Sequence, residues 1–177
     1  MLEALIKGDS NEFNRLRMKY WHVREIDADG RMIKGQDLRY FNLIRLKISD
    51  GHFVDVTLGD TSLENMVFAN CLFEKCGFER NCVSRLRLRY CTLRDSSFTG
   101  VRFSETQVSL TTFERVTFRG CNLSGIKDAH QAHWLDVQID TESQRALLTM
   151  AITKGVKLIS VRSQTSTSTR PKSKHHS

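Results

Sequence analysis

Large apolar residues recur at every fifth position through the middle of the chain. Nineteen consecutive positions at this spacing, from Ile33 to Leu123, are all Leu, Ile, Val or Phe, and they include eight of the ten phenylalanines. If such residues occurred at about 0.3 per site, chance would produce this run with a probability on the order of 10⁻¹⁰. The period of five is therefore a property of the fold.

A second set of inward-pointing positions lies two residues before the first. From Val56 to Ile126 these positions are mostly small or β-branched, and the other three positions of each five are mostly polar, charged or Gly. A period of five fits neither an α-helix nor a flat strand. It predicts a chain that turns a corner every five residues, buries one large and one small side chain on each side, and stacks coil on coil.

Several short stretches of this pattern resemble the pentapeptide-repeat family, in which Leu or Phe is central and a small residue stands two positions earlier. The resemblance covers residues 33–126 and implies an all-β solenoid, a right-handed quadrilateral β-helix in which four repeats of five make one coil. Just under five coils would fit into residues 33–126. The stretches that carry the resemblance are Cys71-Leu72-Phe73, Cys76-Gly77-Phe78, Cys91-Thr92-Leu93, Val116-Thr117-Phe118 and Cys121-Asn122-Leu123.

A coil of four repeats makes a prediction about charges on the outside. Residues separated by four repeats would stack on successive coils, where like charges repel. The outward column Asp55, Lys75, Asp95 and Arg115 alternates in sign. The same column was not needed to find the repeat, so its alternation supports this coil length.

Residues 1–32 precede the repeat and carry a helix signal. Asp9 and Ser10, with Glu12 close behind, form a capping pattern, and Phe13 and Leu16 follow at helical spacing. We expect a short N-terminal capping helix and then a turn at residues 27–30. This segment would cover the apolar interior of the first coil.

Residues 127–161 follow the repeat, which we expect to stop after Ile126. A capping pattern begins at Asp140, a helical face follows, and residues 156–161 are typical of a short strand. This order is similar to the C-terminal segment through which quinolone-resistance pentapeptide proteins dimerise, and the resemblance implies a homodimer. A plain cap over the last coil is the alternative. The candidate dimerisation residues are Leu147, Leu148, Ala151, Ile152, Val156 and Leu158.

Composition and charge set the broad class of the protein. Hydrophobic residues make up 40% and charged residues 27% of the 177 positions, which excludes a fully disordered chain. No apolar run is long enough for a membrane span, and the first residues lack a classical secretory signal. We therefore expect a cytoplasmic protein, with a specialised export route left open.

The net charge of +7 lies largely in the last residues. Residues 162–177 contain four basic and no acidic side chains and nothing apolar that could pack. This segment is typical of a disordered basic tail. We expect it to make weak, nonspecific contacts with polyanions or simply to aid solubility.

The candidates for catalysis or metal binding are few. Four of the five cysteines fall in the small inward set, where they would pack as small hydrophobic residues, and only Cys82 points outward. His130 and His133 lack further ligands at a usual spacing. No phosphate-binding loop or nucleophile motif appears. We therefore expect no enzymatic activity, no catalytic residue, no metal and no cofactor.

The outer surface offers one candidate for binding. An arginine-rich stretch places Arg and Tyr beside exposed aliphatic residues on one side of the coil, a combination typical of interface anchors. The alternative is a solvated face whose arginines pair with neighbouring acids. The candidate partner-binding residues are Arg87, Arg89, Tyr90, Val67, Leu110, Arg85 and Arg94.

Three functions remain open at this point. The first is a bacterial scaffold that binds another, unidentified protein. The second comes from the resemblance, since related proteins protect DNA topoisomerases by imitating the charge and shape of duplex DNA; translocated effectors also occur in the family. The third is direct nucleic-acid binding, which needs a continuous basic stripe. Residues 33–126 carry 13 basic and 10 acidic groups, which argues against DNA mimicry and favours the scaffold.

Overall fold

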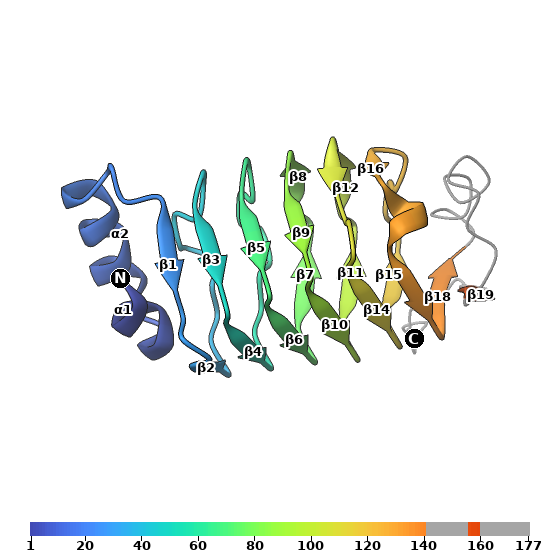
Figure 1. Ribbon diagram of the computed structural model, residues 1–177, viewed down its shortest axis with the longest axis horizontal. Helices are drawn as coiled ribbons and strands as arrows, with labels where there is room; N and C mark the ends of the chain where they lie inside the picture. Colours follow the sequence, from blue (N-terminus) through green and yellow to red (C-terminus); the bar gives the residue numbers. More distant parts are fainter. Residues whose placement is uncertain (141–155, 160–177) are drawn as a thin grey trace, which may run out of the picture.

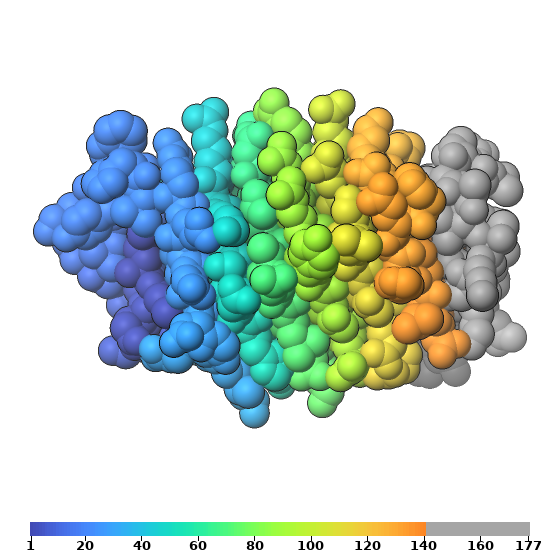
Figure 2. All heavy atoms as spheres, in the orientation of Figure 1, coloured from blue at the N-terminus to red at the C-terminus, as the bar shows by residue number. Residues whose placement is uncertain are grey.

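The computed structural model describes residues 1–140 and 156–159 and is a parallel β-solenoid (Figure 1). Short strands follow one another along the long axis, with two helices at the N-terminal end. In the space-filling view the successive coils cross the surface as parallel bands from the N-terminal end onward (Figure 2). The all-β solenoid class predicted from the repeat is confirmed.

The strands form four parallel sheets, one for each side of the coil. Sheet A contains β1 (Glu25–Asp27), β3 (Lys47–Ser49), β5 (Val67–Ala69), β9 (Arg87–Arg89), β13 (Thr106–Gln107) and β16 (Ile126–Lys127). Sheet B contains β2 (Met32–Lys34), β4 (His52–Val54), β6 (Leu72–Glu74), β10 (Thr92–Arg94), β14 (Thr112–Glu114) and β17 (His133–Leu135). Sheet C contains β7 (Gly77–Glu79), β11 (Ser97–Thr99), β15 (Thr117–Arg119), β18 (Val137–Asp140) and β19 (Val156–Ile159), and sheet D contains β8 (Cys82–Ser84) and β12 (Arg102–Ser104).

The register of these sheets is the one that the period of five predicts. Leu93 of β10 lies opposite Phe73 of β6, and Phe98 of β11 lies opposite Phe118 of β15. The two residues of each pair are separated by four repeats of five, so four sides make one coil. The right-handedness of the coil stays a prediction.

Most corners of the coil are made by a residue in the left-handed backbone region. Such residues recur every five positions, for example Asp50, Asp55 and Asp60 with φ of 50–55°. Asp, Asn and Gly tolerate this conformation best, because a short polar side chain can bond locally or Cβ is missing. Corner residues thus turn the chain while strands of two to four residues form the sides.

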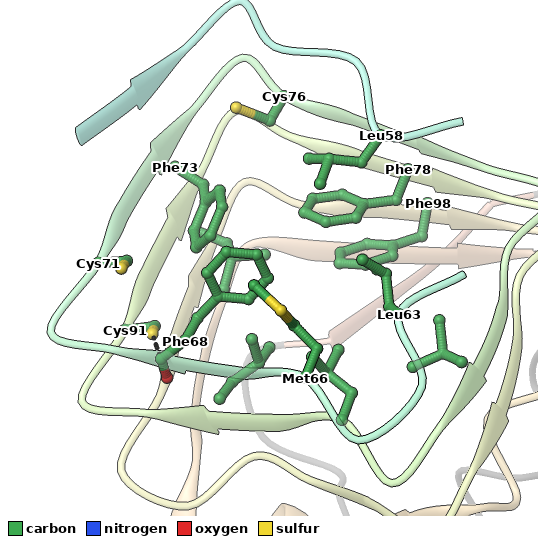
Figure 3. Packing of buried hydrophobic residues seen from close by; sticks show 14 of the residues in the cluster. Leu58, Leu63, Met66, Phe68, Cys71, Phe73, Cys76, Phe78, Cys91 and Phe98 are labelled. Atoms are coloured by element: carbon green, nitrogen blue, oxygen red, sulfur yellow. Dashed lines mark hydrogen bonds between the residues drawn. The ribbon is translucent and has the colours of Figure 1, made fainter. Parts of the chain in front are cut away.

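The core is a set of columns in which rings stack from coil to coil (Figure 3). The ring centroids of Phe78 and Phe98 are 4.4 Å apart and those of Phe98 and Phe118 are 4.9 Å apart, with nearly parallel planes. Small inward positions hold thiols: Cys71 and Cys91 are 2% and 1% exposed and lie on neighbouring coils. One large and one small residue per side thus fill the interior, as close packing of a core requires.

The N-terminal end is closed by two helices, α1 (Leu2–Lys7) and α2 (Ser10–Lys19). The predicted cap is present, since the backbone N–H of Glu12 donates to Oδ1 of Asp9 at 2.9 Å. Phe13 of α2 is fully buried, with its ring centroid 5.0 Å from that of Phe41. The sequence analysis missed α1, whose six residues are too few to show a helical period.

The expectation that the coil stops after Ile126 is wrong. Trp134 of β17 lies opposite Phe113, and Ile139 of β18 lies opposite Phe118. Both separations exceed four repeats of five by one position, because one extra residue is accommodated around the 3-10 turn η1 (Ala129–Gln131). The inserted residue breaks the count of five but not the coil. Sheet A also begins before Ile33, at β1, so the stack extends beyond residues 33–126, for which just under five coils are expected.

The predicted short strand at residues 156–161 is present as β19, which pairs in parallel with β18. The predicted helix at residues 140–152 and the basic tail at residues 162–177 lie outside the described residues, apart from Asp140, which ends β18.

Candidate interaction surface

The outward side chains of β5, β9, β13 and β16 form one side of the solenoid, which we call face A. The parallel register places Val67, Arg87 and Gln107 in one column, and Ala69 and Arg89 in the column beside it. Both arginines are exposed, whereas Val67 and Ala69 are half-buried. The structure thus brings together the arginines and the valine that the sequence analysis selected.

Two large apolar residues stand at the corner that borders face A. Tyr90, directly after β9, is 64% exposed, and Leu110, one coil further on, is 48% exposed. Each has a φ of 54°. Among the described non-glycine residues with positive φ, these two are the exceptions, since the others are Asp, Asn, Glu, Lys or Arg. The apolar corner is therefore a local departure from the rule that builds the coil.

The candidate arginines differ in their ion pairs. Arg85 donates from Nη2 to Oε1 of Glu64 at 3.1 Å, and Arg94 is held by Glu74 and Glu114. Arg87 and Arg89 make no side-chain hydrogen bond or ion pair within residues 1–140 and 156–159. The alternative of a solvated, internally paired face fits Arg85 and Arg94 but not Arg87 and Arg89.

Face B, the outward side chains of sheet B, carries a row of paired charges on β4, β6, β10 and β14. His52 Nε2 lies 2.8 Å from Oε2 of Glu74, and Arg94 lies between Glu74 and Glu114, with contacts of 3.3 and 2.9 Å. Arg115 at the next corner contacts Glu114 and also Asp95, the latter at 2.6 Å. These groups form a row of alternating charges across successive coils.

The row lowers the pKa of its carboxyl groups. The hydrogen bond from His52 and then the charge of Arg94 lower the pKa of Glu74. Arg94 and Arg115 lower the pKa of Glu114, and Arg115 lowers that of Asp95. Asp95 and Arg115 are exposed and the other groups are only half-buried, so solvent and salt screen the pairs and their contribution to stability is small.

Within residues 1–140, the cysteines and histidines do not assemble into a chemical centre. Burial raises the pKa of Cys76 and of Cys121 to about 11, so both thiols are protonated at neutral pH. Cys82 is exposed, with its Sγ 3.5 Å from Nη2 of Arg102. In the part of the chain that the structure describes, no three His, Cys, Asp or Glu side chains gather where they could hold a metal ion.

Membrane insertion through a helix also finds no support in the described residues. None of the helices within residues 1–140 has the length and apolarity that a bilayer crossing requires.

Neither a known family model nor a curated protein matches the chain. Solved structures do. QnrB1, described as a plasmid-mediated fluoroquinolone resistance protein, shares 15% identity over 77% of this chain and 83% of its own, with a TM-score of 0.37. HetL, a pentapeptide repeat protein involved in heterocyst differentiation regulation from the cyanobacterium Nostoc, shares 13% identity over 71% of this chain and 60% of its own, with a TM-score of 0.46. Rfr23, a pentapeptide repeat protein from the cyanobacterium Cyanothece, shares 13% identity over 68% of this chain and 97% of its own, with a TM-score of 0.22.

These likenesses are too distant to argue about function. The period of five, the four parallel sheets and the register of four repeats to a coil decide the fold. The chain folds as a parallel β-solenoid of five-residue sides, four to a coil. In this solenoid, face A and its Tyr90–Leu110 corner combine exposed arginines that lack a partner among the described residues with exposed apolar side chains at positive-φ positions.

Proposed function

We propose that this pentapeptide-repeat solenoid is a non-enzymatic scaffold that binds a protein partner through face A and the Tyr90–Leu110 corner. One observation carries the proposal: two exposed arginines without an intramolecular partner among the described residues stand beside two exposed apolar residues at a corner where the fold favours polar ones. Arg and Tyr supply much of the binding energy at protein interfaces when a partner excludes water from them.

The ion pairs limit which of the candidate arginines can belong to the binding surface. Arg94 belongs to the paired row of face B, and Arg85 is held by Glu64 at the opposite corner of β9. We therefore assign the anchoring role to Arg87, Arg89 and Tyr90, with Val67 and Leu110 as their apolar surroundings.

The experiment is affinity capture from the lysate of the native host, at two salt concentrations, with the full-length protein as bait. The triple variant Arg87→Ala/Arg89→Ala/Tyr90→Ala should lose the main partner that survives the higher salt. The matched control is Arg102→Ala/Arg119→Ala, which removes two exposed arginines from other sides of the coil and should keep that partner. Equal capture by the triple variant and the wild type would contradict the proposal.

We also propose that the protein acts in the bacterial cytoplasm and forms a homodimer through residues 147–158. The pairing of β19 with β18 within one chain supports at least a capping role for the end of this segment. Light scattering at micromolar concentration tests the dimer, and a monomeric mass would contradict it.

A further inference from the structure

The centre of face A lacks negative charge. The strands β5, β9, β13 and β16 contain no Asp or Glu, whereas β6 and β14 of sheet B each contribute a glutamate that neutralises Arg94. Arg87 and Arg89 therefore present two uncompensated positive charges. An anionic ligand would meet no repulsion from the outward side chains of these strands.

The two arginines also define a spacing. They stand at positions i and i+2 of one strand, so both side chains leave the same side of the sheet, about 6.6 Å apart. Alternate side chains of an extended polypeptide have the same spacing. Two carboxylates at positions i and i+2 of such a segment would each meet one guanidinium, which suits the two-pronged Arg–carboxylate hydrogen bond.

The apolar corner adds a third contact. A residue larger than Asn or Gly in the left-handed region costs roughly 1–2 kcal/mol, and Tyr90 and Leu110 also expose much of their apolar surface. Nothing inside the fold requires these side chains, since Asp50 and Asn70 make the same corner on the preceding coils. Contact with an apolar side chain of a partner would offset both costs.

From these three features, and resting on the function proposed above, we infer that face A binds an extended acidic segment of another protein. The segment carries carboxylates at positions i and i+2, which pair with Arg87 and Arg89, and an apolar side chain two or three residues from the nearer carboxylate, which packs on Tyr90 and Leu110. The apolar residue follows the acids if the segment runs parallel to β9 and precedes them if it runs antiparallel.

A nucleic acid fits this surface less well. Its phosphates need a continuous basic stripe, but Val67 and Ala69 lie below the two arginines in their columns, and Gln107 separates Arg87 from Lys127, the next basic side chain of face A. Further along sheet A, Lys47 is already paired with Glu25. The two free arginines thus match a short acidic motif rather than a polyanion.

The test is a titration of fluorescein-labelled peptides with the full-length protein, followed by fluorescence anisotropy at low salt. The probes are Gly-Glu-Ser-Glu-Ser-Leu-Gly, its reversed order, a version with Gln for both Glu, a version with adjacent Glu residues, and a version with Ser for Leu. We expect one of the two orders to bind at least tenfold more tightly than the Gln version. Adjacent acids and loss of the leucine should each weaken binding about threefold.

Variants of the protein locate the contact. Arg87→Ala/Arg89→Ala should reduce the affinity for the acidic peptide to that of the Gln version, and Arg102→Ala/Arg119→Ala should leave it unchanged. Binding that survives the first pair of substitutions would overturn the inference. So would equal binding of acidic and Gln peptides, or no binding of any peptide.

A 12-nucleotide single-stranded DNA probe tests the remaining alternative, in which face A binds a nucleic acid. If it binds through Arg87 and Arg89 while the peptides do not discriminate, the ligand is a nucleic acid and the inference is overturned. If the lysate partner depends on face A but no acidic peptide is preferred, the scaffold function stands and only the acidic motif fails.

Discussion

Faces A and B are built from parallel strands by the same rule, but they carry different side chains on the outside. Both sheets have six strands in parallel register over a shared core of stacked rings. On face B the charged groups pair with one another, from His52 through Arg94 to Asp95. On face A, Arg87 and Arg89 have no such partners among the described residues.

This difference teaches how to separate structural charges from functional ones in a solenoid. A charge that alternates in sign from coil to coil is neutralised by the coils above and below it. Where the alternation fails, the charge is free to act on something outside the molecule. Face A is a place where it fails beside exposed apolar residues.

The largest expected effect concerns the core that the two faces share. Phe73 lies beneath face B, stacked on Phe53 at 4.7 Å, and its ring also meets Phe68 beneath face A edge-on at 5.0 Å. Replacing Phe73 with Ala should lower the free energy of unfolding by about 3–5 kcal/mol because it leaves a cavity. Urea denaturation measures the loss. A cost below about 1 kcal/mol would mean that the columns do not stabilise the coil.

Reversing one charge on each face distinguishes an arginine that stabilises the fold from one that binds a ligand. Arg94→Glu would place three carboxylates in a row on face B and should lower the thermal midpoint by a few degrees. Arg87→Glu should leave the midpoint nearly unchanged, because Arg87 has no partner to lose among the described residues, but should abolish binding of the acidic peptide. Circular dichroism melts and the anisotropy titration measure both properties. Equal midpoints for the two variants would remove the distinction between the faces.

The pH dependence of the thermal midpoint tests whether the effect of Arg94→Glu comes from charge. The pKa values of Glu74 and Glu114 are lowered in the folded protein, so their pairing with Arg94 stabilises it at neutral pH and is lost as the pH falls below about 4.5. The difference in midpoint between wild type and Arg94→Glu should therefore shrink toward pH 3. A difference that stays constant with pH would point to lost packing instead of charge.

The smallest expected effect lies at the apolar corner. Leu110→Asn should raise the free energy of unfolding by about 0.5–1 kcal/mol, because Asn accepts the left-handed backbone more readily than Leu. The same change should weaken peptide binding about threefold. Chemical denaturation should therefore show a gain in stability, and the peptide titration should show a loss of affinity. A variant that is less stable and binds normally would show that Leu110 serves the fold.

Much of this architecture could be predicted from the spacing of residues alone. The period of five predicts the inward columns, and the coil of four repeats predicts which charges meet. Arg80 forms an ion pair with Asp60 and Arg115 with Asp95, in each case one coil earlier. The same rule shows that Arg87 and Arg89 have Val67 and Ala69 below them, so their lack of partners was readable in the sequence.

The ends of the solenoid could not be predicted in the same way. Ile26 lies opposite Ile48, a separation longer than four repeats of five by two positions, and Trp134 lies opposite Phe113, a separation longer by one. Such extra residues shift the count while the backbone hydrogen bonds and inward side chains remain. The pattern detects regular coils, whereas the structure tolerates irregular ones wherever a turn can absorb the extra length.

The extra residue near Ala129 has a consequence for how such a molecule can change over time. A single inserted residue is tolerated where a turn takes it up, as around Ala129, whereas one inserted within a strand would turn the following inward side chains outward. Growth or shortening that keeps every corner in place therefore occurs in whole coils of four repeats. Each duplicated coil between the helices and β9 would move the arginines about 4.8 Å further from the N-terminal end. The number of coils thus sets the distance between the N-terminal helices and the arginines, in steps of one coil.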